Sequence, residues 1–214
     1  MGSDETVLRG YLRLAPVIPV VTIDDARISI DLAQALVRAG LPVVEVTLRT
    51  SAALDAISAI AKAVPEAVVA AGTVLARSQI GEVIDAGAKF IVTPGTPVRL
   101  AEALREASIP AMPGCATVSE AMTLADIGFH ALKFFPAAAS GGPAWLKSVQ
   151  GPLPNLTFCP TGGIDRASAS SYLALANVAC VGGTWVTPAE AMKKGNLAEI
   201  GRLAADAAAL RRQT

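Results

Sequence analysis

The sequence predicts an α/β fold in which eight parallel strands alternate with helices and close into a (β/α)8 barrel, the TIM barrel. Eight short apolar runs start near the following residues: Pro16, Val43, Ala67, Lys89, Ile109, His130, Thr157 and Val178. Successive starts lie 20 to 27 residues apart, the length of one strand, one helix and two short loops. Strands separated by helices form parallel sheets, and eight such units close a barrel. An open doubly wound sheet normally stops at five or six strands.

The helices between these runs carry ordinary start and stop signals. Asp24 and Asp25 are able to cap the helix that follows the first run. Gly40 can end that helix in a left-handed turn, and Gly87 and Gly128 are placed to end two later helices in the same way. These signals support the alternation of strands and helices.

The length and composition predict one compact domain. At 214 residues with 52% hydrophobic side chains, the chain can bury a sizeable core. It is shorter than the roughly 250 residues typical of this fold, so the loops are expected to be short, with no inserted domain. We therefore predict a single barrel domain over residues 1–214. A short extra N-terminal helix, about residues 5–14, is expected to cover the barrel floor.

The charge balance excludes several classes of partner. Lys plus Arg and Asp plus Glu both number 18, and no long basic run occurs, which argues against nucleic-acid binding. Cys115, Cys159 and Cys180 each lie in an apolar run and are interpreted as core residues of a protein in a reducing compartment. No apolar run reaches the ~18 residues of a membrane helix, and no signal peptide is recognised. A cytoplasmic protein that binds a small neutral or anionic molecule is expected.

Lys133 is a charged residue in the middle of an apolar strand. The run from His130 to Pro136 reads His-Ala-Leu-Lys-Phe-Phe-Pro, where a strand buried on both faces should be continuously hydrophobic. Burial favours the neutral form of a lysine, and a neutral amine can condense with a ketone to give a Schiff base. The alternative is a structural lysine that reaches solvent from the strand end or pairs with a buried carboxylate.

The second strand carries three polar residues on one face. Alternation along this strand places Glu45, Thr47 and Arg49 together, facing the barrel interior. The same rule places Lys133 and Phe135 on the interior face of the sixth strand. A carboxylate near an imine-forming lysine supplies the proton shuttle of carbonyl chemistry, and an arginine can bind a substrate carboxylate. An ion pair between Glu45 and Arg49 is the structural alternative.

Further polar and glycine positions lie where other strands end. Thr73 closes the third strand with a hydroxyl, although such a threonine is often only a turn residue. Gly162–Gly163 and Gly182–Gly183 follow the last two runs, where barrel loops and a helix start commonly bind phosphate; plain tight turns are the alternative. His130 is the only histidine, and it begins a strand, so we expect a structural role. One histidine cannot supply a metal site of several histidines, which leaves lysine chemistry without a metal.

Five segments stand out in combination: 45–50 (EVTLRT), 71–74 (AGTV), 92–95 (VTPG), 132–137 (LKFFPA) and 158–164 (FCPTGGI). Together they resemble the family of 2-keto-3-deoxy-6-phosphogluconate (KDPG) aldolases, class I enzymes of the pyruvate-aldolase group. The resemblance extends from about Pro16 to Trp185. It implies a barrel that cleaves its substrate through a lysine imine.

The resemblance also implies a role for each matching residue. Lys133 would form the imine with the pyruvate moiety, Glu45 would transfer protons, and Arg49 and Thr73 would hold the carboxylate. The other expected substrate contacts are Pro94, Phe135, Thr161, Gly162, Gly163, Gly183 and Thr184, of which Thr161, the glycines and Thr184 would surround the distal phosphate. The family is usually trimeric, so a homotrimer is expected, and no cofactor is required.

The implied reaction is reversible cleavage of KDPG to pyruvate and glyceraldehyde 3-phosphate, with 4-hydroxy-2-oxoglutarate as a further expected substrate. Thr184 stands where serine is usual and keeps the hydroxyl. Related phosphogalactonate aldolases are expected to have an apolar residue at the position of Thr161, so this threonine favours the gluconate epimer. Two other interpretations stay open: a phosphate-binding barrel with other chemistry, such as a sugar-phosphate epimerase, and a non-catalytic assembly subunit, natural or engineered.

Overall fold

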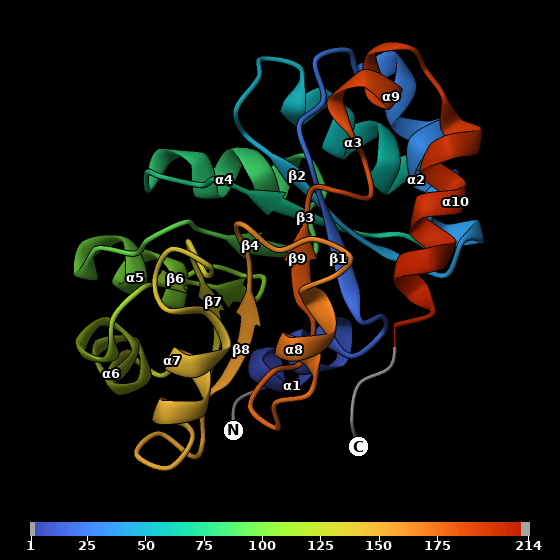
Figure 1. Ribbon diagram of the computed structural model, residues 1–214. Coiled ribbons are helices and arrows are strands. Elements are labelled where there is room, and N and C mark those ends of the chain that lie inside the picture. Colours follow the sequence, from blue (N-terminus) through green and yellow to red (C-terminus); the bar gives the residue numbers. More distant parts are fainter. Residues whose placement is uncertain (1–2, 211–214) are drawn as a thin grey trace.

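The structure is a computed structural model that describes residues 3–210, with parallel strands inside and helices outside (Figure 1). The strands are β1 (Val17–Val21), β2 (Val43–Thr47), β3 (Val68–Gly72), β4 (Phe90–Val92), β5 (Ala111–Met112), β6 (Gly114–Cys115), β7 (Ala131–Phe134), β8 (Thr157–Pro160) and β9 (Val181–Gly183). The helices are α1 (Ser3–Leu12), α2 (Ser29–Arg38), α3 (Ala53–Ala63), α4 (Ser78–Asp85), α5 (Val98–Arg105), α6 (Val118–Ile127), α7 (Gly142–Val149), α8 (Ala169–Leu173), α9 (Ala189–Lys193) and α10 (Leu197–Ala208), with a 3-10 turn at Ala26–Ile28. Each predicted apolar run contains a strand, and the run from Ile109 contains two.

Backbone hydrogen bonds join these strands into two parallel sheets. A curled six-stranded sheet has the order β5-β4-β3-β2-β1-β9, and a three-stranded sheet has the order β6-β7-β8. The chain passes from the first sheet to the second at Pro113, which has no N–H to donate to a neighbouring strand. Isolated parallel bridges, Phe158 with Val178 and Thr161 with Gly182, connect β8 to the last strand segment. The predicted α/β class with parallel strands is therefore confirmed.

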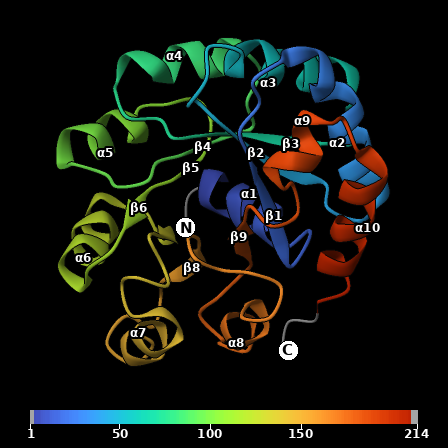
Figure 2. The same cartoon turned by 45° about the horizontal axis from the view of Figure 1, so that its top comes forward.

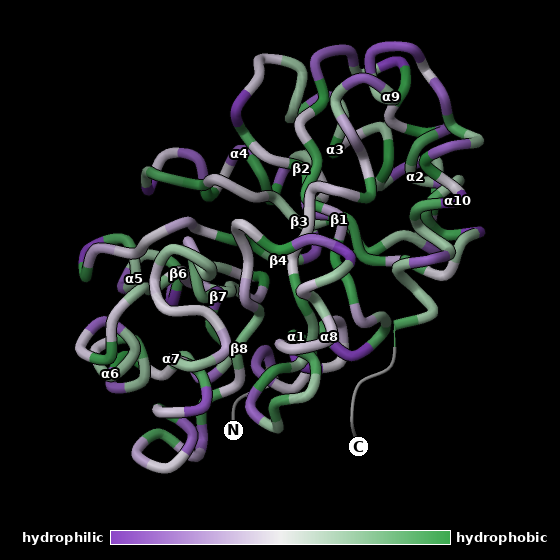
Figure 3. Tube along the Cα trace, viewed as in Figure 1, coloured by the Kyte–Doolittle hydropathy of each residue, from purple (hydrophilic) through white to green (hydrophobic). Residues whose placement is uncertain are grey.

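The strands separate two apolar layers. The layer between strands and helices contains Val44 and Val46 of β2. The inner layer contains Val43, with these residues from other elements: Leu8, Leu12, Ile18, Ala70, Phe90, Val92, Met112, Ala131, Cys159, Ala179 and Cys180. Figure 3 shows hydrophobic residues along the strands and hydrophilic stretches in the peripheral loops. The alternation predicted for β2 is confirmed, because odd-numbered and even-numbered residues fall into different layers.

Helix α1 covers the end of the sheets at which the strands begin. Leu8 and Leu12 belong to the inner apolar layer, and Figure 2 shows α1 near the middle of the molecule, with the other helices around it. Arg9 donates hydrogen bonds to Thr157 Oγ1 at 2.8 Å and to the carbonyl oxygen of His130 at 3.3 Å. The extra helix is thus present where it was expected, and it ends at Leu12, two residues earlier than predicted.

The predicted glycine stops are confirmed, whereas the predicted cap of α2 is wrong. Asp25 caps the 3-10 turn, where its carboxylate accepts from Arg27 N, and α2 begins after Ile28 without a side-chain cap. Gly40, Gly87 and Gly128 have φ values of 91°, 93° and 104°, in the left-handed region that glycine tolerates. Helix α6 begins with a capping box, in which the Thr117 hydroxyl accepts from Glu120 N and the Glu120 carboxylate accepts from Thr117 N. Within residues 3–210, none of the helices has the length and apolar character needed to span a membrane.

Candidate active site

A cavity of about 360 Å³ opens at the carboxyl ends of the strands. The residues that line it are Val20, Arg49, Thr73, Pro94, Lys133, Phe135, Thr161, Gly162, Gly163, Ile164, Gly182, Gly183 and Thr184. These include ten of the eleven predicted site residues, and the eleventh, Glu45, is buried in contact with Lys133. Val20 and Ile164 were not predicted as site residues, and Gly182 was considered only as part of the second glycine pair.

Lys133 lies at the base of this cavity with 4% of its surface exposed. The alternation of β7 turns Leu132 and Phe134 towards the helices and Lys133 towards the interior. Lys133 Nζ donates a hydrogen bond to Glu45 Oε1 at 2.8 Å and lies 5.6 Å from the centre of the Phe135 ring. The Glu45 carboxylate and the Phe135 ring are therefore the two groups next to the Lys133 nitrogen.

Glu45 is 2% exposed and occupies the interior face of β2. The structure does not contain the ion pair between Glu45 and Arg49 that was considered as an alternative. Glu45 instead pairs with Lys133, and Arg49 is exposed at the cavity rim. Thr47 is buried, and its Oγ1 donates to the carbonyl oxygen of Val21 at 3.0 Å, which joins β2 to β1. The predicted polar face therefore divides into a buried acid, a structural hydroxyl and an arginine at the rim.

Gly72 leaves the space that the Glu45 side chain fills. A Cβ at position 72 would lie 2.7 Å from Glu45 Cγ and 2.9 Å from Cδ. These distances are shorter than the ~3.5–4.0 Å of an ordinary carbon contact. The absence of a side chain at Gly72 therefore admits the carboxylic acid of Glu45. The register of the two strands, in which Gly72 pairs with Thr47, is the feature that decides this contact.

Thr73 has a left-handed backbone conformation, with a φ of 61°. A β-branched residue rarely adopts this conformation, which costs on the order of 1–3 kcal/mol. The residue follows β3 directly and lines the cavity, half-buried. Such strain is concentrated at functional sites, so it supports a functional position for Thr73 rather than a plain turn. The sequence does not predict this left-handed conformation, because glycine or asparagine usually occupies such a position and a threonine gives no sign of it.

The loop after β8 is built on two glycines. Gly162 and Gly163 have φ values of 98° and 71°, so their backbone N–H groups take directions that other residues rarely adopt. A helix start was expected to follow directly, but α8 begins only at Ala169. The intervening segment is a turn in which the Asp165 carboxylate accepts hydrogen bonds from the backbone N–H and the hydroxyl of Ser168. The loop therefore offers backbone groups to the cavity without an adjacent helix start.

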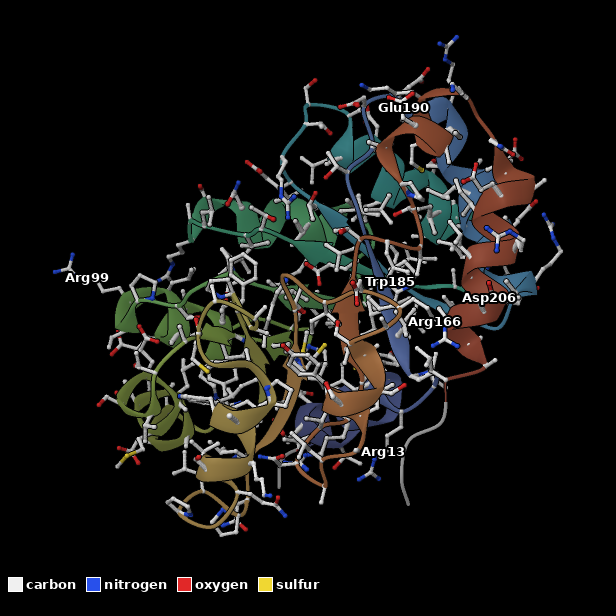
Figure 4. All side chains as sticks on the ribbon, in the orientation of Figure 1. Arg13, Arg99, Arg166, Trp185, Glu190 and Asp206 are labelled. Carbon is white, nitrogen blue, oxygen red and sulfur yellow. The ribbon has the colours of Figure 1, made fainter. Side chains whose placement is uncertain are left out.

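The second glycine pair makes room for two side chains. A Cβ at Gly182 would collide with the hydroxyl of Thr161, which is 5% exposed and lines the cavity. A Cβ at Gly183 would overlap the ring of Trp185, which Figure 4 labels above the end of β9. Thr184, between Gly183 and Trp185, is exposed at the rim. These glycines are required by packing. A glycine pair that makes room for side chains and one that binds phosphate look the same in the sequence.

His130 and the three cysteines are not among the residues that line this cavity. His130 precedes β7 at the opposite end of the strands, where it was predicted to be structural, and it lines a separate cavity of about 440 Å³. Cys115, Cys159 and Cys180 are buried and form no disulfide bond, and burial raises the pKa of Cys115 to about 12. Among residues 3–210, no group of three His, Cys, Asp or Glu side chains is arranged to hold a metal ion.

A lysine and an acid in contact at the base of a cavity, at the carboxyl ends of parallel strands, are typical of α/β enzymes that act on carbonyl compounds. The sequence model of the KDPG and KHG aldolase family matches residues 8–203. The chain belongs to this family of aldolases.

Individual relatives are similar to this chain in sequence and structure over nearly its whole length. The KHG/KDPG aldolase of Escherichia coli strain K12 is 47% identical over 97% of this chain and 97% of its own length. A crystal structure of KDPG aldolase from Legionella pneumophila, with pyruvate captured as a covalent carbinolamine, superposes with a TM-score of 0.92. It is 41% identical and covers 94% of this chain and 98% of its own. A native KDPGal structure has a TM-score of 0.80 and 27% identity, over 89% of this chain and 91% of its own.

Proposed function

We propose that this chain is a class I aldolase that reversibly cleaves KDPG to pyruvate and glyceraldehyde 3-phosphate. The observation that carries the proposal is the buried Lys133 Nζ, 2.8 Å from Glu45 Oε1 at the base of the cavity. Membership of the family and the pyruvate carbinolamine of the Legionella relative support the same chemistry. An imine-forming amine needs to be shielded from water and close to a proton acceptor, and Lys133 meets both requirements.

The proposed reaction starts with proton transfer from Lys133 to Glu45 along their hydrogen bond. The neutral amine attacks C2 of the substrate to give a carbinolamine. Glu45 returns its proton to the carbinolamine hydroxyl, which leaves as water, so that an iminium ion forms and Glu45 is again a carboxylate. Glu45 then takes the C4 hydroxyl proton while the C3–C4 bond breaks, and the bonding electrons pass to the iminium nitrogen. This releases the aldehyde and leaves an enamine. Protonation of the enamine at C3 and hydrolysis of the imine free pyruvate and restore Lys133.

The cavity walls are assigned to the substrate from end to end. We assign the carboxylate to Arg49 and Thr73, and the pyruvate moiety to the space between Pro94 and Phe135. The distal phosphate is assigned to Thr161, Gly162, Gly163, Gly183 and Thr184. The arrangement is supported by the shared cavity, whose volume of about 360 Å³ suits a small ligand. In this assignment the reactive amine lies between the two anionic ends.

Trapping the imine tests this proposal directly. Incubation with pyruvate and borohydride should reduce the imine to a stable secondary amine, and peptide mass spectrometry should place the adduct on Lys133. The variant Lys147→Ala, at an exposed position of α7, is the control and should be labelled like the wild type. An unmodified Lys133 under conditions that trap a control aldolase would refute the proposal. Cleavage activity that survives Lys133→Ala would favour other chemistry, such as epimerisation on a phosphate-binding barrel.

The substrate epimer is decided by kcat/KM values for the gluconate and galactonate compounds. We propose the gluconate compound, because Thr161 lines the cavity and KDPG aldolases are the nearer relatives in identity. The value for KDPG should exceed that for its epimer, and the reverse order would make the protein a phosphogalactonate aldolase. Glyoxylate with pyruvate, to give 4-hydroxy-2-oxoglutarate, is proposed as a further substrate pair.

We also propose that the two sheets close as a (β/α)8 barrel in a single domain over residues 1–214. At one junction between the sheets, isolated bridges connect β8 to the last strand segment. At the other junction, one apolar run supplies both β5, at the edge of the first sheet, and β6, at the edge of the second, so the chain itself joins the two edges.

A homotrimer in the cytoplasm is proposed as the working form. Exposed apolar side chains lie in three consecutive strand–helix units: Leu75, Val98, Val118 and Met122. Val118 and Met122 are four residues apart on α6, so they share one face. Sedimentation analysis of the wild type should give three times the chain mass, and the double variant Val118→Glu, Met122→Glu should give smaller species. A monomeric wild type would refute the trimer, and particles much larger than a trimer would favour an assembly role.

A further inference from the structure

The Lys133–Glu45 pair connects the two sheets. Glu45 belongs to β2 of the six-stranded sheet, whereas Lys133 belongs to β7 of the three-stranded sheet. The distance between the amine and the carboxylate therefore depends on how the sheets are held together. The chain passes between them at Pro113, which has no N–H for backbone pairing. The β6 strand beyond it needs other hydrogen bonds to stay beside the end of β4.

Two threonine hydroxyls supply these hydrogen bonds. Gly114 N donates to Thr93 Oγ1 at 3.0 Å, and Thr96 Oγ1 donates to Gly114 O at 3.0 Å. The two hydroxyl oxygens lie 2.6 Å apart. Because the Thr96 proton is engaged with Gly114 O, Thr93 donates to Thr96, and the three bonds form a closed ring. Thr93 is 0% exposed, so water cannot replace a lost partner without opening the structure.

The ring holds two elements that lie next to the reactive amine. Gly114 pairs in register with Lys133, and the carbonyl oxygen of Pro113 accepts the Lys133 backbone N–H at 2.9 Å. Pro94, which follows Thr93, lines the cavity. A Cβ at Gly114 would collide with the carbonyl oxygens of Thr93 and Pro94. The approach of β6 to this loop is therefore so close that only glycine fits, and the hydroxyl ring is what holds it there.

We propose that Thr93 is a positioning residue, whose hydroxyl holds β6 against the loop after β4 and thereby sets the place of Lys133 relative to Glu45 and Pro94. This inference rests on the proposed function, since the imine reaction requires the amine and the acid within hydrogen-bond distance. Thr93 acts through Gly114 and β7, without contact with the cavity. Displacing reacting groups by about 1 Å can slow a reaction about 10²-fold, so the loss falls mainly on kcat.

The test compares two substitutions at this position. Thr93→Val keeps the shape and removes the hydroxyl, whereas Thr93→Ser keeps the hydroxyl. Thr157→Val is the matched control, because it removes a threonine hydroxyl that bonds Arg9 at the opposite end of the strands. We expect T93V to lower kcat about 10- to 100-fold and to change the KM for KDPG by less than about threefold. T93S and T157V should stay within about threefold of the wild-type kcat.

Wild-type protein measured in parallel separates this inference from the proposed function. A wild type without activity and without a pyruvate adduct refutes the proposed function and therefore also the positioning role of Thr93. An active wild type alongside T93V with unchanged kcat refutes the positioning role alone. If circular dichroism shows that T93V does not fold, Thr96→Val breaks the same ring at a half-buried position. Unchanged kcat in the folded T96V refutes the role equally.

Discussion

Replacing Gly72 by alanine should lower kcat strongly while the protein still folds. A Cβ at this position would lie 2.7 Å from Glu45 Cγ, about 0.8 Å short of an ordinary contact. The backbone φ of Gly72 is not in the left-handed region, so alanine fits the main chain and Glu45 has to move. A shift of about 1 Å between the acid and Lys133 should lower kcat about 10²-fold. The free energy of unfolding should fall by about 1–3 kcal/mol, the usual cost of overpacking.

The assay follows pyruvate release with an NADH-linked dehydrogenase, and urea unfolding measures stability. Gly81→Ala is the matched control, because Gly81 lies within α4 and no atom lies within 4 Å of a Cβ placed there. It should keep the wild-type kcat and gain up to about 1 kcal/mol from helix propensity. A G72A protein with wild-type kcat would show that the place of Glu45 against β3 is irrelevant to the reaction.

Three further outcomes are expected. Glu45→Gln should lower kcat about 10²- to 10⁴-fold, the usual contribution of a general acid–base group, and an unchanged rate of pyruvate release would contradict the role of Glu45. Hydrogen bonds from the backbone N–H groups of Ala116 and Thr117 lower the pKa of Glu120 below its ordinary value of 4.5, in spite of partial burial. Its stabilisation is therefore present above that value and lost as the pH falls through the lowered pKa. Glu120→Gln should destabilise the protein at about pH 7, and the loss should shrink as the pH falls below 4.5. Urea unfolding with a loss that does not change with pH would contradict this. Because burial raises the pKa of Cys115 to about 12 and the other two cysteines are buried as well, a thiol reagent should titrate no cysteine in the native protein and three after unfolding; any rapid native reaction would contradict it.

Local patterns were sufficient to predict the strands and the direction of their side chains. The alternation of β2 placed Glu45 on the interior face, and the same rule placed Lys133 on the interior face of β7. Both residues are indeed buried, and they are in contact although 88 residues separate them along the chain. Their common location could be predicted because the carboxyl ends of parallel strands meet at one end of the fold.

The conformation of Thr73 and the role of Gly72 could not be predicted in the same way. A φ of 61° at a threonine opposes its local preference, so only the surrounding structure can hold it. Gly72 is needed because Glu45 on the neighbouring strand fills its missing side chain, which is a property of the strand register. The late start of α8 likewise follows from the turn between Asp165 and Ser168, which competes with a helix start.

The sequence by itself determined the order of strands and helices and the burial of Lys133, because these depend on hydrophobic period and on chain direction. Several of the other residues that meet at the cavity, such as Pro94 and Thr161, were expected from the resemblance to a known family. Only the tertiary structure decided that Glu45 pairs with Lys133 rather than with Arg49, and that Thr93 closes a hydrogen-bond ring around Gly114. These contacts join groups on different strands and loops. Their distances depend on strand register and on the packing between the two sheets, to which no local pattern along the chain is sensitive.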